Sequence, residues 1–297
     1  MANREEADRT LAHHEASLLA NDNVTSISVI EDENGEMIIE IGLIGPETSA
    51  LAATPEELAI PDAAGLLSTG GQTIPVRKRV IGEIRAQSFT NRVRPADGGN
   101  SCGPATATWS GTLGARIQYK GSACILSNWH VLYGGKGKDK DPVVQPAVGD
   151  GGTPPKDTIG ANLQGVLSEY VDAAIATIES PPDTFVVTGT RCYGPIKGIA
   201  TVKVGDPVKK CGRTTEATIG TVRSINATVK VSGYPDGTRT FRDQIQTTNM
   251  SNPGDSGSIV LDANSQAVGL LFAGGATDTF ANKLSRISEA FGSSFSF

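Results

Sequence analysis

The chain has 297 residues, of which 38% are hydrophobic and 20% are charged. This balance excludes a disordered or fibrous protein and leaves room for one large or two medium-sized cores. The formal net charge of −6, without a Lys/Arg-rich face, argues against binding to nucleic acid. Residues 1–20 carry charges throughout, unlike a secretory signal, and no later segment has the length of a membrane span. We therefore expect a cytoplasmic globular protein that binds neither nucleic acid nor membranes.

Residues 1–92 are predicted to form a small α+β domain. The elements expected in it are, in chain order, a helix at 2–20, strands at 24–30 and 37–44, a short helix at 55–58 and a strand at 74–84. Asn34-Gly35, between the first two strands, is a dipeptide that β-hairpin turns favour. No residue of this domain has an evident chemical role. We therefore expect the domain to regulate the rest of the chain or to mediate assembly, including a homo-oligomer.

A polar, glycine-rich passage, residues 93–103, is predicted to be a linker to residues 104–297. The apolar runs of the larger part are short and bounded by turn residues, which favours an all-β body. Pro181-Pro182 interrupts the strands, because proline cannot continue a central strand. We predict two β-barrels and a C-terminal helix, at about 104–180, about 183–280 and 281–292.

Neither the cysteines nor the acidic loops of the chain have the spacing of a metal site. The four cysteines, which show no CxxC pairing and no nearby histidines, are Cys102, Cys124, Cys192 and Cys211. We interpret them as reduced, partly buried thiols. In the loop from Gly134 to Pro154, lysines and aspartates alternate without the order of calcium ligands. The sequence therefore predicts no metal and no cofactor.

A serine lies inside a glycine-bounded turn, Gly254-Asp-Ser-Gly257, just before the apolar run that begins at Ile259. Such a turn exposes the Ser256 hydroxyl and can direct backbone N–H groups toward one point. Taken alone, the same tetrapeptide also fits a simple hairpin loop. Ser256 is therefore a candidate nucleophile that requires a base elsewhere in the chain.

His130 is the one histidine outside the N-terminal helix, so it is the imidazole available to Ser256. It follows an apolar run, and a hydrogen-bonded core histidine is the alternative reading. Asp172 opens the apolar run 172–178, where an imidazole N–H would offset part of the cost of burying a carboxylate. An aspartate at the start of a strand is also a common turn acceptor.

In this order, the segments SNWHV, VDAAIA and GDSG resemble the trypsin/chymotrypsin-like serine peptidase family, and in particular a bacterial, intracellular type with an N-terminal α+β extension. The resemblance covers about residues 104–292. It implies a mainly β fold, the chymotrypsin-like double six-stranded β-barrel with a C-terminal helix. Two positions depart from the family pattern: Ser127-Asn-Trp129 precedes the histidine, and Ser258 replaces a usual glycine.

The resemblance implies a serine endopeptidase that cleaves protein or peptide substrates through an acyl-enzyme intermediate. His130, Asp172 and Ser256 would form the catalytic triad. The amides of Gly254 and Ser256 would form the oxyanion hole.

Further residues gain roles from the same resemblance. Asp255 would pair with Arg213 or Lys210, which would make the oxyanion loop competent without cleavage of a precursor. The substrate-binding residues that it implies are Met250, Phe272, Ala273, Gly274 and Asp278. Met250 at the base of the specificity pocket would favour uncharged side chains, whereas Asp278 would attract Lys or Arg, so the preference stays open.

Two other classes of protein compete with this interpretation. One is a protease-fold binding or regulatory protein with little or no catalytic activity; the retention of candidates for all three triad positions argues against it. The other is an α/β-hydrolase esterase, whose Gly-x-Ser-x-Gly elbow and serine-before-histidine order are both unmatched here.

Overall fold

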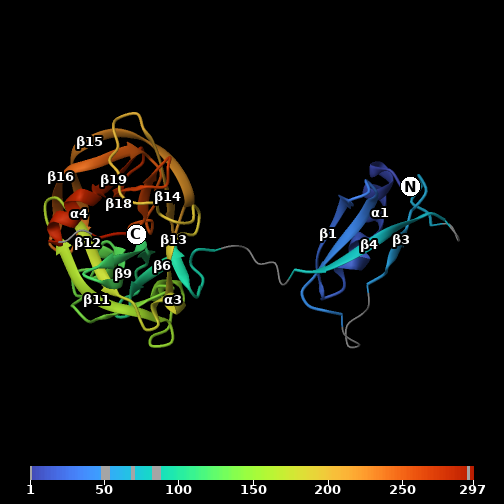
Figure 1. The fold of residues 1–297 in the computed structure, drawn as a ribbon, viewed down its shortest axis with the longest axis horizontal. Helices are drawn as coiled ribbons and strands as arrows, with labels where there is room; N and C mark the ends of the chain where they lie inside the picture. The colour runs from blue at the N-terminus through green and yellow to red at the C-terminus, as the bar shows by residue number, and fades with distance from the viewer. Residues whose placement is uncertain (1, 48–53, 68–70, 82–87, 293–294) are drawn as a thin grey trace. The chain divides into compact units, whose positions relative to one another are not determined.

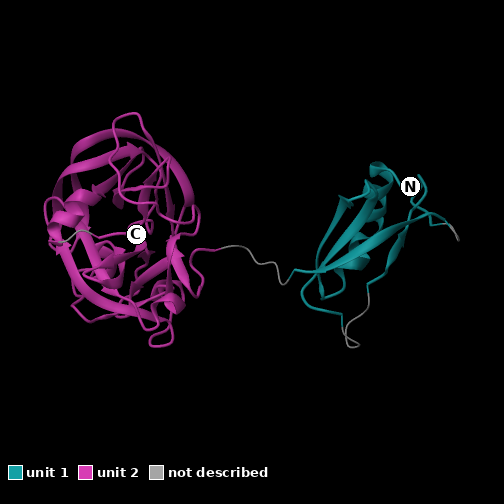
Figure 2. Cartoon of the chain, in the orientation of Figure 1, with its two compact units in different colours: residues 1–87 teal, residues 88–297 magenta. Residues whose placement is uncertain are grey.

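The computed structural model describes residues 2–47, 54–67, 71–81, 88–292 and 295–297. The chain divides into two compact units, Met1–Gln87 and Ser88–Phe297 (Figure 1, Figure 2). Each unit has hydrophobic core residues of its own. No helix among the described residues combines the length and the apolar character needed to cross a membrane.

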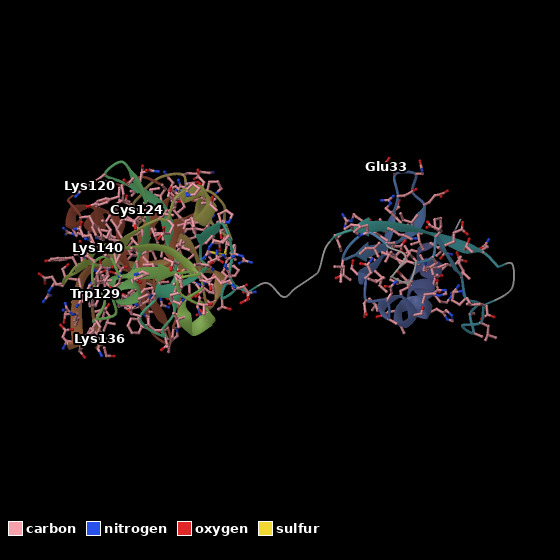
Figure 3. All side chains as sticks on the ribbon, turned by 90° about the horizontal axis from the view of Figure 1, so that it is seen from below. Glu33, Lys120, Cys124, Trp129, Lys136 and Lys140 are labelled. Atoms are coloured by element: carbon pink, nitrogen blue, oxygen red, sulfur yellow. A yellow bond between two sulfur atoms is a disulfide. The ribbon has the colours of Figure 1, made fainter. Side chains whose placement is uncertain are left out.

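The described residues of the first unit form one helix and a mixed four-stranded sheet, an α+β unit as predicted, although two helices and three strands were expected. Helix α1 (Arg4–Leu19) begins at a capping box, in which the Asn3 side chain accepts from the Glu6 N–H over 3.0 Å. The strands are β1 (Val24–Glu31), β2 (Met37–Leu43), β3 (Glu57–Ala59) and β4 (Thr73–Val80), in the order β1-β2-β4-β3. Glu33 lies at the tip of the β1–β2 hairpin (Figure 3).

The predicted short helix at 55–58 is wrong, because this segment enters strand β3. Leu58 pairs with Ile74 of β4, and both side chains are buried. They join α1 and β2 residues in one core, which includes Leu18, Ile39 and Ile41. Burial against the sheet therefore overrides the weak local helix signal.

The first half of the second unit is a seven-stranded sheet of order β7-β6-β10-β11-β12-β9-β8. Its strands are β6 (Ser101–Pro104), β7 (Gly111–Thr112), β8 (Ala115–Tyr119), β9 (Ser122–Ser127), β10 (Pro142–Val144), β11 (Thr158–Leu167) and β12 (Asp172–Thr177). Leu113 and Gly114 alone join the two edge strands, β7 and β8, so the sheet must curl until its edges approach each other. It is a curled sheet of seven strands where six were predicted.

The second half is a closed six-stranded barrel, as predicted. Its strands are β14 (Pro207–Gly212), β15 (Glu216–Tyr234), β16 (Gly237–Thr248), β17 (Ile259–Asp262), β18 (Ala267–Gly274) and β19 (Asp278–Lys283). Strands β15 and β16 form a long hairpin (Figure 1). Apolar side chains such as Val208, Val222 and Val260 fill the interior.

The predicted linker, residues 93–103, belongs to the second unit. Strand β5 (Ala96–Gly98) pairs in parallel with β13 (Val186–Thr190), and β6 lies inside the curled sheet. The Arg94 guanidinium donates to the backbone carbonyls of Gln145 and Asp157 over 2.8 and 3.0 Å. The glycines of this passage therefore serve close packing: Gly98 lies against the backbone of Gly114.

The C-terminal helix α4 (Leu284–Ala290) begins later than the predicted 281, because Ala281 and Asn282 still pair with β18. Its buried side chains are Leu284 and Ile287. A short helix α3 (Pro182–Phe185) starts at the double proline, before β13. Strand β13 therefore pairs with β5 instead of contributing to the second barrel.

Two of the four cysteines differ from the prediction. Cys192 and Cys211 form a disulfide between the segment after β13 and the end of β14. Cys102 and Cys124 are free and buried, and burial raises the pKa of the Cys102 thiol to about 12. The disulfide is of a kind more common outside the cytoplasm, and the cytoplasmic location stays a prediction.

Candidate active site

Neighbouring strands of the curled sheet bring His130 and Asp172 together. Strand β9 ends at Ser127 and leads into α2 (Trp129–Leu132), which carries His130, while Asp172 opens the paired strand β12. His130 Nδ1 lies 2.6 Å from Asp172 Oδ2, and the His130 backbone N–H donates to Oδ1 over 3.1 Å. The imidazole is 29% exposed and the carboxylate is fully buried. A carboxylate facing Nδ1 holds the proton there, so Nε2 is the nitrogen available as a base.

Asp172 is buried, yet both of its carboxylate oxygens accept hydrogen bonds. Besides the His130 contacts, the Tyr234 hydroxyl donates to Oδ2. The backbone of Asp172 is also fixed, since its N–H donates to Asn282 Oδ1 over 2.9 Å and its carbonyl accepts from Asn128 Nδ2 over 2.7 Å. These bonds offset the cost of burying the carboxylate.

Ser256 lies in the loop between β16 and β17, and this loop contacts the curled sheet. Gly257 has φ +99°, and a Cβ there would lie 2.2 Å from the Thr112 carbonyl oxygen, so glycine is required. The Ser256 carbonyl accepts from the Thr112 N–H over 2.8 Å. Ser256 and His130 both line a cleft of about 1130 Å³. The Ser256 hydroxyl donates to the Phe272 carbonyl over 3.3 Å, so attack would require it to turn toward His130.

The amides of Gly254 and Ser256 are free donors beside this cleft. Among the hydrogen bonds of the described residues, neither N–H has an acceptor. The Pro253 carbonyl accepts from the Thr214 hydroxyl over 2.9 Å. Because a trans peptide directs its carbonyl and N–H to opposite sides, this bond turns the Gly254 N–H away from Thr214. Both amides are thus free to donate, as an oxyanion hole requires, and their role in one stays a prediction.

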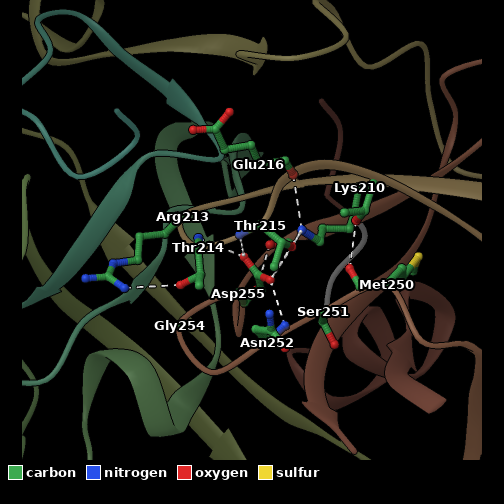
Figure 4. Close-up of polar contacts among 12 residues, drawn as sticks. Lys210, Arg213, Thr214, Thr215, Glu216, Met250, Ser251, Asn252, Gly254 and Asp255 are labelled. Carbon is green, nitrogen blue, oxygen red and sulfur yellow. Dashed lines mark hydrogen bonds and ion pairs between the residues drawn. The ribbon is translucent and has the colours of Figure 1, made fainter. Parts of the chain in front are cut away.

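Asp255, between these two amides in sequence, is anchored to the β14–β15 turn (Figure 4). Its carboxylate accepts from the N–H groups of Thr214, Thr215 and Asn252 over 2.9, 3.0 and 2.9 Å. Lys210 Nζ lies 3.4 Å from Asp255 Oδ2, and neither side chain has exposed surface. Burial raises the pKa of Asp255. The Thr215 hydroxyl, the Asn252 amide and the Lys210 charge lower the pKa by more than burial raises it, so the net pKa lies below the ordinary value. The two side chains therefore form a charged, buried pair.

Of the two cations predicted to pair with Asp255, Lys210 does so and Arg213 does not. Arg213 binds Asp150 of the curled sheet's half, with Nε 2.9 Å from Oδ2 and a second contact through Nη2. The planar guanidinium suits such a two-point contact with a carboxylate. The Arg213 N–H also donates to Thr112 Oγ1 over 3.0 Å. Arg213 thus connects the two halves beside the loop without touching Asp255.

A second cavity, of about 610 Å³, adjoins Ser256. Its walls include Phe272, Ala273 and Gly274 of β18, and that these residues bind substrate stays a prediction. The remaining lining residues are polar or apolar but uncharged: Val231, Asn249, Ser251, Asn252, Pro253, Leu271, Gly275 and Ala276. The described residues therefore bring no ionisable side chain to this pocket.

Met250 and Asp278, both predicted to reach the pocket, lie elsewhere. Asn249 and Ser251 line the pocket, but Met250 between them points into the barrel core and is 3% exposed. The Asp278 carboxylate accepts from Arg223 Nη1 over 2.8 Å and from Gln246 Nε2 over 3.0 Å. Met250 was predicted from its position six residues before Ser256. That spacing does not show that successive side chains here point alternately into the core and into the pocket.

In the described part of the chain, no three His, Cys, Asp or Glu side chains are grouped as metal ligands. In the loop after His130, Asp139 accepts from the Tyr133 hydroxyl over 2.7 Å and Asp141 accepts from the Lys138 N–H over 2.8 Å. Lys136 of this loop is exposed at the surface (Figure 3). That the protein needs no metal or cofactor stays a prediction.

Several residues of the site were not predicted, among them Asn128, Thr214, Tyr234 and Asn282. Asn128 and Asn282 lie at the ends of apolar runs, where a buried amide without hydrogen bonds would be costly. Their roles as hydrogen-bonding partners could therefore have been predicted from the sequence. Thr214 and Tyr234 lie in a turn and at a hairpin tip. Their sequence neighbours suggest only a change of chain direction.

Comparison with known proteins agrees with this architecture. No protein-family model matches the chain, and no curated protein matches it. Solved structures do match. Protease A of Thermobifida fusca is 21% identical, with 66% of this chain and 95% of that chain covered and a TM-score of 0.51. A serine protease specific for glutamic acid is 21% identical, with 68% and 99% covered and a TM-score of 0.52. Nocardiopsis protease is 21% identical, with 67% and 97% covered and a TM-score of 0.51.

These matches, together with the two β halves, define the class: the chain contains the chymotrypsin-like fold of bacterial serine proteases. It carries in addition an N-terminal helix with a small mixed sheet, and a C-terminal helix. At these identities the likeness concerns the fold, and the chemistry must be argued from the site.

Proposed function

We propose that the protein is a serine endopeptidase that hydrolyses peptide bonds in protein or peptide substrates. The observation that carries the proposal is the convergence on one cleft of a His130–Asp172 pair from the curled sheet and Ser256 from the barrel loop. The free amides of Gly254 and Ser256 beside the cleft complete the arrangement. Nucleophile, base, orienting carboxylate and oxyanion donors are the parts that acyl transfer needs.

In the proposed reaction, Ser256 Oγ turns from the Phe272 carbonyl, gives its proton to His130 Nε2 and attacks the scissile carbonyl carbon. Asp172 keeps the ring in place and stabilises the imidazolium. The amides of Gly254 and Ser256 bind the oxyanion, a contribution of about 3 kcal/mol for each donor. His130 then protonates the leaving amine, and water releases the acyl group by the reverse sequence.

The Asp255–Lys210 pair supports activity of the uncleaved chain. A buried carboxylate here needs a cation, and Lys210 supplies it from within the same barrel. The oxyanion loop is therefore ordered without a new N-terminus released by cleavage. We accordingly propose that proteolytic activation is unnecessary.

The test is a Ser256→Ala variant assayed on casein and labelled with a fluorophosphonate probe. We expect hydrolysis to fall by at least about 10³-fold and labelling to disappear, because the nucleophile is gone while the fold is retained. Ser224→Ala, on strand β15, is the matched control and should retain both. Equal hydrolysis by Ser256→Ala and the unaltered protein would rule out this nucleophile.

One observation favours a second candidate, a protease-fold binding protein with little or no activity: the Ser256 hydroxyl is bonded to the Phe272 carbonyl. If this bond persisted with substrate present, the serine would be unreactive. The second candidate predicts peptide binding to the unaltered protein with neither hydrolysis nor fluorophosphonate labelling. The same assay therefore separates the two functions.

A further inference from the structure

Asp172 receives a hydrogen bond from a part of the molecule remote in sequence. The donor is the hydroxyl of Tyr234, and the acceptor is Oδ2, the same oxygen that faces His130 Nδ1. Asp172 belongs to the curled sheet, whereas Tyr234 is the last residue of β15 in the barrel. The proposed base is thus oriented by groups from both halves.

Aromatic packing fixes the Tyr234 ring beside His130. The two rings meet edge to face, with centroids 5.9 Å apart and planes at 79°. On its other side Tyr234 packs against Phe241, at 5.4 Å between centroids, and Phe241 packs against Phe272 of the pocket at 4.8 Å. Tyr234 is 7% exposed. Such contacts restrict the ring to one orientation and aim its hydroxyl at Asp172.

The tip of the β15–β16 hairpin is held against the half that carries Asp172. Pro235, the residue after Tyr234, packs against Gly135 in the loop that follows α2. Burial and then the charge of Asp172 raise the pKa of Tyr234, so its hydroxyl stays protonated and remains a donor.

We infer that Tyr234 is a positioning residue for the His130–Asp172 pair, supplied by the β15–β16 hairpin. The inference rests on the proposed function. Its hydroxyl shares Oδ2 with His130, which fixes the carboxylate and withdraws part of its negative charge from the ring. Without the hydroxyl, the carboxylate would hold the imidazolium more tightly and its orientation would be less restricted.

The test compares Tyr234→Phe with Tyr119→Phe in the full chain. Both tyrosines are buried and both hydroxyls donate hydrogen bonds, but Tyr119 bonds to Gln164 and Phe291. We expect Tyr234→Phe to lower kcat about 10-fold with little change in KM, since the ring that packs against His130 is kept. Tyr119→Phe should keep kcat, although it too loses a buried hydrogen bond.

The pH profile separates positioning from loss of stability. In Tyr234→Phe the acid limb of kcat/KM should move to higher pH by roughly half a unit to one unit, because the imidazolium gains attraction from Asp172. The other charged groups around the cleft, which both variants retain, are Lys136, Lys138 and Asp141, with Arg239 and Asp236 on the hairpin. An unmoved acid limb and an unchanged kcat in Tyr234→Phe would overturn the inference.

A measurement that does not depend on catalysis distinguishes failure of the Tyr234 inference from failure of the proposed function. The His130 ring signals are followed by NMR against pH in Ser256→Ala, with and without Tyr234→Phe, and assigned with His130→Gln. A titration midpoint that rises in the double variant supports positioning by Tyr234 even if no peptide is ever cleaved. A midpoint that stays in place refutes it, even if the unaltered protein is an active peptidase.

Discussion

Lys210 is among the largest of the fully buried side chains in the described residues. Its ammonium group contacts Asp255, the Thr215 hydroxyl and the Glu216 carbonyl, so its three N–H donors are matched by three oxygens. Burial lowers the pKa of Lys210, and Asp255 opposes that shift. A buried pair of this kind is destabilising to break, because the remaining charge has no partner.

The pH dependence of stability should therefore report on Asp255. Its folded-state pKa lies below the ordinary value of 3.8, so its contribution is complete above that value and is lost as pH falls through the folded-state pKa. We expect Asp255→Asn to lower the free energy of unfolding by about 3 kcal/mol between pH 5 and 7, with the difference shrinking below about pH 4.

Urea unfolding followed by tryptophan fluorescence measures this effect selectively, because both tryptophans of the chain, Trp109 and Trp129, lie in the second unit. The control is Asp236→Asn, which removes an exposed ion pair with Arg239 and should change the midpoint little. A difference that stays constant down to pH 3 would contradict the charged-pair assignment.

At the scale of elements, the pocket beside Ser256 derives its chemistry from strand β18 and the loop before the serine. Phe272, Ala273 and Gly274 contribute small or apolar walls, and Asn249 and Ser251 contribute neutral polar ones. An ionised side chain placed there would lose water without gaining an opposite charge. We therefore propose that the pocket accepts uncharged side chains of a substrate.

A fluorogenic peptide panel tests this preference. We expect kcat/KM to be at least about 10-fold higher for uncharged residues than for Lys, Arg, Asp or Glu before the scissile bond. Ala276→Asp, which adds a carboxylate to the lining, should improve cleavage after Lys and Arg. Faster cleavage after Lys or Arg by the unaltered protein would refute the assignment and return attention to Asp278.

The elements differ in how far the sequence determines them. Alternating apolar residues and the Asn34-Gly35 turn predicted the β1–β2 hairpin, and the strands beside His130 and Asp172 were found in the same way. Strand β3 and residues 93–103 were missed, because their structure comes from pairing with distant strands. Tyr234 shows the limit most clearly: it lies 62 residues from its acceptor, and nothing local marks that contact.

At the scale of the whole molecule, the N-terminal unit has its own core and is followed by a unit that contains every residue of the candidate site. We propose that the N-terminal unit controls access of substrates or mediates assembly. In either role the N-terminal unit would act without contributing a residue to the reaction.

Deleting residues 1–87 tests that role. We expect the uncleaved full chain to be active, and the deletion variant to cleave a short peptide within about 3-fold of its rate, since the triad is intact. For the deletion variant, either the rate of cleavage of a folded protein or the molar mass in solution, measured by light scattering, should differ from that of the full chain. If activity on both substrates and mass per protomer are unaffected, the proposed role fails. Activity that appears only after clipping of the full chain would refute the proposal that activation is unnecessary.

The last strand-like contact of the chain leads back to the curled sheet. Gln118 of β8 donates to the Ser296 carbonyl over 2.8 Å, and Phe295 is buried beside Tyr119 and Phe291. Because synthesis proceeds from the N-terminus, the partner of β8 at Ser296 is made long after β8 itself. During synthesis the chain gains the serine loop first and the contact with Ser296 afterwards. The proposed site can therefore assemble only after both halves of the second unit have been synthesised.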